Sequence, residues 1–176
     1  MKIIYNDNLQ SERLVTRFLV REDALAWCEF VSDKTATQFF PDFYAPDNPL
    51  PAAERFLAKQ FVRYNERTFG LQALIEKQTG DFIGLCGLLL QTVDGKHELE
   101  VGYQILPRCW GKGYATEAAR MFMDYAAENK LNYSIISVID VGNIASEKVA
   151  EKNGLTREKR INYQGLDVWV YRKELF

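Results

Sequence analysis

The stretch over residues 97–128 limits the possible folds more than any other part of this chain. It runs from a strand-like segment, His97–Ile105, through a loop with Gly111 and Gly113, into a helical pattern over Tyr114–Glu128. Two glycines just before a helix let main-chain amides approach a ligand, because no Cβ is in the way. The first N–H groups of a helix lack intrahelical partners and carry partial positive charge. The stretch therefore predicts a site for a phosphate or diphosphate at the helix start.

Composition predicts one domain over residues 1–176 with a sizeable core. The hydrophobic fraction of 47% excludes wholesale disorder. The 22 Lys and Arg against 24 Asp and Glu give a net charge of −2, so neither a nucleic-acid nor a membrane-surface partner is expected. The longest strongly apolar run, Leu85–Leu90, is too short to span a bilayer, and Met1–Gln10 lacks the apolar stretch of a signal peptide. We expect a cytoplasmic protein, with monomer and homodimer both open.

Three cysteines and one histidine limit metal and covalent chemistry. Cys28, Cys86 and Cys109 have no metal-like spacing, and His97 is the only histidine, so no metal site is expected. Unpaired thiols fit a reducing compartment. Cys109 lies in the glycine loop, but no histidine is adjacent in sequence, which argues against an acyl-cysteine intermediate.

Hydrophobic periodicity predicts a mixed α+β fold. Strands are predicted over Leu14–Leu19, Phe69–Glu76, Phe82–Gln91, His97–Ile105, Ser134–Val141 and two segments flanking Gln164-Gly165. Helices are predicted over Arg21–Val31, Pro51–Tyr64, Tyr114–Glu128 and Asn143–Asn153. Asn143 suits the N-cap of the last helix and Gly154 its end. Residues 35–50 read as irregular.

Two other phosphate-binding motifs fit less well. A P-loop needs Ser or Thr after Gly-Lys, and Gly113 follows here. A dinucleotide-binding motif would have Thr116 as its third glycine, and its acidic residue, Asp140, lies too far along the chain. A nicotinamide-binding function therefore stays a weaker alternative.

Motifs along most of the chain resemble those of the GNAT acetyltransferase superfamily. The segment similar to its acetyl-CoA diphosphate motif is Arg108-x-x-Gly111-x-Gly113-Tyr114-Ala115, followed by Glu117-Ala118. Glu100-Val101-Gly102-Tyr103 resembles the preceding strand, and Asn143-x-x-Ser146 with Glu151–Leu155 the next strand–helix element. Ser11-Glu12-Arg13-Leu14, with Arg17 and Glu22-Asp23-Ala24, resembles the N-terminal signature of the branch that includes ribosomal-protein N-terminal acetyltransferases.

This resemblance implies a mixed, mainly antiparallel sheet flanked by helices. The parallel strands His97–Ile105 and Ser134–Val141 would splay apart, with acetyl-CoA as co-substrate in the opening. The implied cofactor-binding residues are Gln104, Ile105, Arg108, Gly111, Lys112, Gly113, Tyr114, Ala115, Asn143 and Ser146. The implied activity is direct acetyl transfer, in a ternary complex, to a primary amine of a peptide N-terminus or a small molecule such as a polyamine, aminoglycoside or amino acid.

Candidate catalytic residues follow from the strand and the last helix. Glu98 and Glu100 share a strand face, and Glu100 is preferred as general base because it is nearer the glycine loop; a solvated face is the alternative. A free N–H near Gln104 or Ile105 would stabilise the developing oxyanion. Many family members have a tyrosine as proton donor where this chain has Ala150, so Ser146 is the candidate acid. Because Ala150 replaces the usual tyrosine, a non-catalytic CoA-binding module is the alternative function.

Two further segments have two interpretations each. The aromatic segment Phe39–Tyr44 is either a lid on the acceptor side or a loop packed on the core. Lys148 and Lys152 either meet the 3′-phosphate of CoA or face water.

Overall fold

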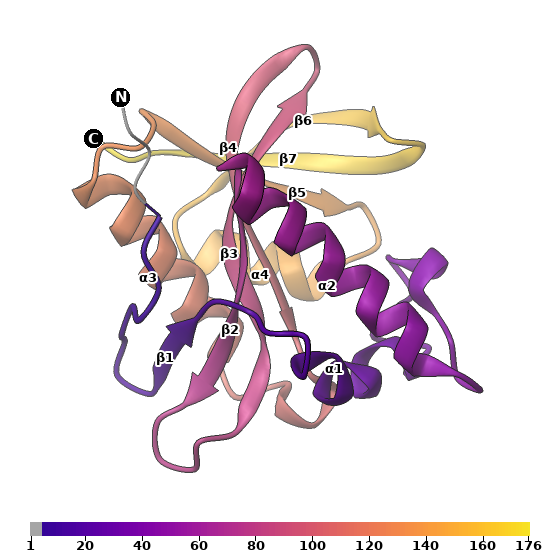
Figure 1. The fold of residues 1–176 in the computed structure, drawn as a ribbon. Coiled ribbons are helices and arrows are strands. Elements are labelled where there is room, and N and C mark those ends of the chain that lie inside the picture. The colour runs from indigo at the N-terminus through magenta and orange to yellow at the C-terminus, as the bar shows by residue number, and fades with distance from the viewer. Residues whose placement is uncertain (1–4) are drawn as a thin grey trace.

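Seven strands form one sheet in the computed structural model, which describes residues 5–176 (Figure 1). The strands are β1 (Leu14–Arg17), β2 (Phe69–Glu76), β3 (Phe82–Val93), β4 (Lys96–Ile105), β5 (Ser134–Asp140), β6 (Thr156–Tyr163) and β7 (Leu166–Glu174). Their order in the sheet is β1-β2-β3-β4-β5-β7-β6, and β4 with β5 is the parallel pair. The prediction about Met1–Gln10 falls in part on residues 1–4, outside the described residues.

Helices cover both faces of this sheet (Figure 1). They are α1 (Asp23–Ser32), α2 (Pro49–Glu66), α3 (Tyr114–Glu128) and α4 (Ile144–Lys152), with the single-turn helices η1 (Pro41–Phe43) and η2 (Pro107–Cys109). Residues of α1 and α2 share a core cluster with one face, and residues of α3 and α4 share another with the opposite face. The predicted α+β class and the mainly antiparallel sheet are confirmed.

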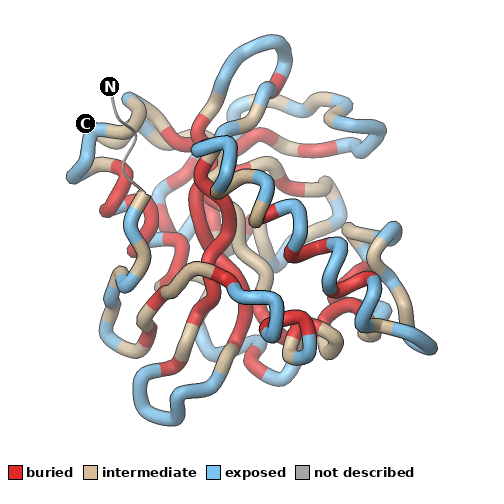
Figure 2. The backbone as a smooth tube through the Cα atoms, in the orientation of Figure 1, coloured by how far each residue is buried: buried red, intermediate tan, exposed pale blue. Residues whose placement is uncertain are grey.

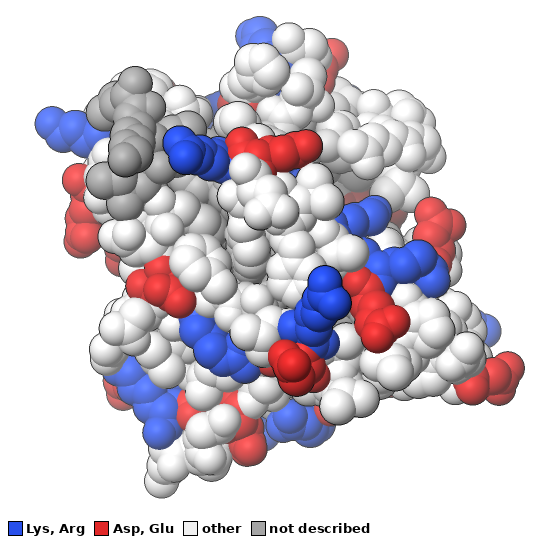
Figure 3. Space-filling view, viewed as in Figure 1, with Lys and Arg blue, Asp and Glu red and all other residues white. Residues whose placement is uncertain are grey.

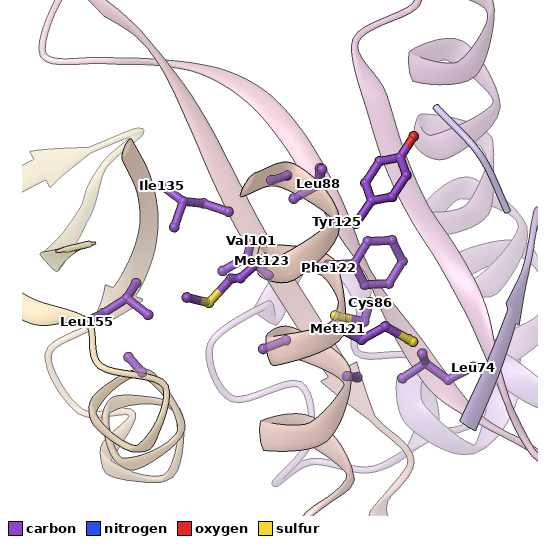
Figure 4. Close-up of a cluster of buried hydrophobic side chains, with 14 of the residues drawn as sticks. Leu74, Cys86, Leu88, Val101, Met121, Phe122, Met123, Tyr125, Ile135 and Leu155 are labelled. Carbon is purple, nitrogen blue, oxygen red and sulfur yellow. The ribbon is translucent and has the colours of Figure 1, made fainter. Parts of the chain in front are cut away.

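The core under α3 fixes where that helix begins. Figure 4 shows Phe122 and Met123 of α3 beside Leu88 and Val101 of the sheet. Phe122 and Leu88 are fully buried, and the tube in Figure 2 is buried through the central strands. Burial of a large apolar side chain contributes about 1.5–3 kcal/mol, so several such contacts hold α3 in place. The main-chain amides at its N-terminus are therefore held in a fixed position beside the end of β4.

The opposite face is closed by stacked aromatic rings. Trp27 and Phe30 of α1 stack with their ring centroids 4.4 Å apart and their planes at 8°. Phe56 of α2 lies 5.3 Å from Trp27. These contacts tie α1 to α2, so the loop between the two helices is anchored at both ends.

The surface seen in Figure 3 carries mixed charges. Lys and Arg side chains lie among Asp and Glu on that face, without an extended patch of one sign. Within the described part of the chain, every helix is too short or too polar to cross a bilayer.

Candidate functional site

The parallel strands β4 and β5 diverge soon after they meet. They pair at one position, Glu100 with Ile136, whereas β4 pairs with β3 along its whole length. Beyond Glu100 the strands open into a cleft of about 550 Å³. Its walls come from the end of β4, the starts of α3 and α4, and the loop after α1. The predicted splayed pair is thus present.

Alternate main-chain groups of β4 face this opening. The C=O groups of Val101 and Ile105 point away from β3, since they accept hydrogen bonds from Ser137 Oγ at 3.3 Å and Trp110 Nε1 at 2.7 Å. In a strand, the N–H of a residue lies on the same side as its C=O. The N–H groups of Tyr103 and Ile105 therefore face the opening and can donate to a ligand that lies along β4.

Gln104 is placed differently from the prediction. Its neighbour Leu106 donates its N–H to Ile83 O at 2.9 Å, so the Gln104 N–H also points toward β3, where Gln104 pairs with Leu85. Of the two N–H groups predicted as oxyanion donors, that of Ile105 faces the opening and that of Gln104 does not, and the Tyr103 N–H faces the opening as well. The side chain of Gln104 lines the cleft, and its buried Oε1 has no partner among residues 5–176.

The loop between β4 and α3 presents three free amides. Gly111 and Gly113 have φ values of 74° and 80°, which residues with a Cβ rarely adopt. Within the described residues, the N–H groups of Gly111, Lys112 and Gly113 have no acceptor. The first turn of α3 adds further unpaired N–H groups, since its first bond runs from Glu117 N to Gly113 O at 3.1 Å. We call residues 111–115, which include Tyr114 and Ala115, the amide cradle.

Arg108, predicted to help hold the diphosphate, is engaged in contacts within the protein. Its Nε lies 3.0 Å from Glu29 Oε2, and its Nη2 lies 2.8 Å from Phe82 O. The Arg108 N–H also reaches Glu29 Oε1 at 3.3 Å, and the N–H groups of Cys109 and Trp110 bond within the turn. Arg108 therefore fastens the loop to α1, and the groups free to bind an anion begin at Gly111.

Positive side chains still border the cradle. The Lys112 side chain is exposed and has no partner in the described part of the chain. Lys148 and Lys152 are exposed and line the same cleft from α4, so they lie within the site rather than on a remote surface.

Glu100 lies at the narrow end of the opening. Its side chain is only 7% exposed, which excludes the solvated-face alternative. Its Oε2 accepts from Gln91 Nε2 at 2.9 Å and its Oε1 from Val138 N at 3.2 Å, so the carboxyl bridges toward β5. Burial raises the pKa of the Glu100 carboxyl, and these hydrogen bonds oppose that shift. A buried carboxyl with a raised pKa at the point where β4 and β5 begin to diverge suits a general base.

Glu98 and His97 are less suited to proton transfer. Glu98 holds Arg172 through contacts of 2.7 and 3.0 Å, and the Arg172 guanidinium lowers the pKa of the Glu98 carboxyl. His97 is exposed near the start of β4, with Nδ1 3.3 Å from Thr92 Oγ1. Of the two glutamates, Glu100 has the raised pKa and is therefore the stronger base.

The hydroxyl of Tyr103, from β4, meets the start of α4 in the cleft, beside the predicted acid Ser146. Asn143 caps the helix, since its Oδ1 accepts from Ser146 N at 3.2 Å. Tyr103 reaches across from β4 and donates its hydroxyl to Ser146 O at 2.9 Å. Tyr103 and Ser146 both line the cleft, whereas Ala150 is buried. Burial raises the Tyr103 pKa, so this hydroxyl stays protonated. Tyr103 was part of the sequence motif, but only its hydrogen bond to Ser146 in the folded structure shows that its hydroxyl reaches α4.

The aromatic segment after α1 splits between the two predicted roles. Phe43 packs against Phe56 with ring centroids 4.9 Å apart, and Phe40 also contacts Phe56 at 6.4 Å. Phe39 lines the cleft, and its ring lies 3.4 Å from where a Cβ on Gly142 would be. Phe39 therefore brings the loop up to the turn after β5, while Phe40 lines the cleft and also packs against the core, and Phe43 packs against the core.

Metal and thiol chemistry gain no support at this site. Within residues 5–176 no three His, Cys, Asp or Glu side chains gather as a metal site. Cys109 lines the cleft but is only 4% exposed, and its Sγ lies 3.5 Å from Arg108 Nη1.

The N-terminal motif has a role at the site that sequence analysis missed. Glu117 of α3 accepts from Ser11 Oγ at 2.7 Å, Arg13 N at 2.8 Å and Arg13 Nε at 2.7 Å. Both motifs were visible in the sequence, but nothing in either indicates that they pair across more than a hundred residues.

Comparison with known proteins gives the family. The model described as Acetyltransferase (GNAT) domain matches residues 13–156. YkkB of Bacillus subtilis (strain 168), itself described as uncharacterized, is 37% identical over 123 residues, which cover 67% of this chain and 72% of YkkB.

Two solved structures share the fold. RimL, a ribosomal L7/L12 alpha-N-protein acetyltransferase in complex with coenzyme A, has a TM-score of 0.75 at 16% identity, covering 96% of this chain and 98% of its own. A spermidine N-acetyltransferase SpeG chimera from Vibrio cholerae and hSSAT has a TM-score of 0.70 at 18% identity, covering 93% and 96%. With the family match, the splayed strands and the amide cradle, the chain belongs to the GNAT acetyltransferase domain family.

Proposed function

We propose that this protein transfers the acetyl group of acetyl-CoA directly to a primary amine in a ternary complex. The observation that carries the proposal is the opening between β4 and β5, which has free N–H groups along one strand and ends at the amide cradle. A ligand with an amide-containing arm and a diphosphate matches both parts.

The residues present fit acetyl-CoA. The five N–H groups of the amide cradle would hold the diphosphate, with Lys112 adding charge. The N–H of Ile105, next to the cradle, would pair with the pantetheine arm, and Asn143 would contact the arm from the start of α4. Acetyl-CoA supplies the thioester carbonyl that the amine attacks.

Three groups of this chain then act on the reacting atoms. Glu100 accepts the proton of the attacking amine, directly or through one water. The Tyr103 N–H, which lies farther from the cradle than that of Ile105, stabilises the negative charge that develops on the thioester oxygen. The Tyr103 hydroxyl or Ser146 Oγ donates a proton to the departing thiolate.

The acceptor is proposed to be the α-amine of a protein or peptide N-terminus, with a small-molecule amine as the second candidate. The N-terminal motif supports the branch that includes ribosomal-protein acetyltransferases. The shared fold does not decide between these acceptors, since one structural neighbour is named for acetylating a ribosomal protein and another for acetylating spermidine. The cost of deprotonation favours the α-amine. At pH 7 it is about 1.4 kcal/mol for an α-amine with a pKa near 8 and about 4.6 kcal/mol for a lysine-like amine with a pKa near 10.4.

A non-catalytic CoA-binding module is the second candidate function. It is favoured by Ala150, which is buried where many family members carry a tyrosine. Tyr103 offers a hydroxyl in the same cleft, which supports the enzyme.

Release of free thiol from acetyl-CoA, measured with a panel of amines, separates the two functions. We expect peptides with free N-termini to accelerate release, and N-terminally blocked peptides of the same sequence to have no effect. Mass spectrometry should find one acetyl group on the amine. Tight CoA binding without acceleration by any amine would leave the non-catalytic module.

Tyr103→Phe should lower kcat by about tenfold while the KM for acetyl-CoA stays within about twofold. The substitution removes the proton donor and keeps the ring that fills the cleft wall. Steady-state kinetics at saturating amine measures both constants, and Ser146→Ala is the matched variant. Unchanged kcat in Tyr103→Phe with a loss in Ser146→Ala would assign the donor to Ser146.

A further inference from the structure

One guanidinium group contacts the amide cradle at two residues and the first turn of α3 at a third. Arg13 Nη1 donates to Lys112 O at 2.8 Å. The Arg13 Cζ atom lies 4.4 Å from the centre of the Tyr114 ring, a cation–π distance. Arg13 Nε forms an ion pair with Glu117 Oε2 at 2.7 Å. The side chain comes from the segment before β1, so a distant part of the chain holds the cradle.

The contact with Lys112 sets the direction of an amide in the cradle. The peptide unit is planar and trans, so its C=O and N–H point in opposite directions. Because Arg13 holds the Lys112 carbonyl, the N–H of Gly113 in the same peptide unit must point to the other side. Gly113 lines the cleft, and a Cβ on it would lie 3.5 Å from Arg13 Nη2, so Gly113 lies between Arg13 and the cleft.

The contact with Glu117 offsets a negative charge that would oppose anion binding. Glu117 lies in the first turn of α3, one turn from the free amides. An ionised carboxylate there would repel a diphosphate. Burial raises the pKa of the Glu117 carboxyl, but the Ser11 hydroxyl and the N–H and guanidinium of Arg13 outweigh it and hold the pKa below its usual range. Glu117 is therefore ionised, and the Arg13 charge offsets it.

We infer that Arg13 is a positioning residue for the diphosphate of acetyl-CoA: it aims the Gly113 N–H and neutralises Glu117. The inference rests on the proposed CoA-binding function. It concerns donor recognition only, because Arg13 lies behind the cradle, away from the acetyl end. It also gives the N-terminal motif Ser11-Glu12-Arg13 a task in binding.

The test compares CoA with pantetheine, which lacks the diphosphate. Calorimetry measures the Kd of each for the wild type and for Arg13→Met. We expect the wild type to bind CoA far more tightly than pantetheine. In Arg13→Met the Kd for CoA should rise about tenfold or more, with pantetheine binding changed less than about twofold. Adding Glu117→Gln to Arg13→Met should recover part of the lost CoA affinity, because the carboxylate left unpaired by Arg13→Met is then removed.

Arg17→Met is the matched control. Arg17 also pairs with a carboxylate, through two contacts of 2.8 Å to Asp23, and it lies in β1. We expect it to leave both Kd values unchanged. Equal weakening of CoA and pantetheine in Arg13→Met, or a fully retained preference for CoA, would overturn the positioning role alone. A wild type that binds CoA no better than pantetheine would overturn the amide cradle, and the positioning role with it.

Discussion

Gly111→Asp is expected to raise the KM for acetyl-CoA by about 100-fold and to change kcat little. The new carboxylate would stand at the first free amide of the cradle, where the diphosphate is proposed to bind. Two unit charges about 5 Å apart at an effective dielectric constant of 20 repel by about 3 kcal/mol, which corresponds to that change. Initial rates at varied acetyl-CoA and saturating amine measure both constants.

Gly111→Asn isolates the charge in this experiment. A Cβ at Gly111 meets no atom within 4 Å, so added bulk is tolerated. Its φ of 74° is left-handed, a region that Asn and Asp adopt more readily than other residues with a Cβ. Asn should therefore change the KM by only a few-fold. Equal KM values for both variants and the wild type would mean that the diphosphate binds elsewhere.

The sequence allowed most of the fold to be predicted where its signals are local. β2 and α3 have the predicted bounds, because a mostly apolar run ends before clear turn residues in the one and a helical pattern follows the glycine loop in the other. α2 begins at Pro49 rather than at Pro51, since either proline suits the first turn of a helix. The amide cradle was predictable for the same reason: glycines before a helix act through their own backbone.

The rest of the site depends on contacts between distant segments. Arg108 and Arg13 have the same side chain, and both belong to motifs near the glycines or the N-terminus. Their contacts differ because Arg108 pairs with Glu29, 79 residues away in the sequence, and Arg13 pairs with Glu117, 104 residues away. The burial of Glu100 likewise follows from how β3 and β5 flank β4. Local patterns carry none of this information.

Glu100→Gln is expected to lower kcat by about 100-fold for an amine of pKa near 10 and by about tenfold for one near 8. The amine must lose a proton before or during attack, and an amine of higher pKa depends more on a base. Steady-state rates with alkylamines and α-amines of matched size measure the difference. A small, equal loss with every amine would remove Glu100 from the proton transfer.

The pH dependence separates loss of a base from loss of structure. Burial raises the Glu100 pKa, so in the wild type kcat should climb as pH increases through a value above that of an ordinary glutamate. In Glu100→Gln the increase of kcat through the Glu100 pKa should be absent, and the increase due to deprotonation of the amine itself should remain. The free energy of unfolding should not fall in Glu100→Gln. A carboxyl whose pKa is raised in the folded state stabilises the fold below its unfolded-state pKa, and this contribution is lost as pH rises through the folded-state pKa. At pH 7 the charge of Glu100 is therefore destabilising, and its removal relieves that cost.

Glu98→Gln on the same strand is the matched variant. Its carboxyl has a lowered pKa and is held by Arg172, so the substitution should lower the Tm at pH 7 while kcat stays within about twofold. The two glutamates therefore give opposite results, one in catalysis and one in stability. A loss of kcat in Glu98→Gln as large as that in Glu100→Gln would show that the effect comes from a disturbed strand, and the assignment of the base to Glu100 would fail.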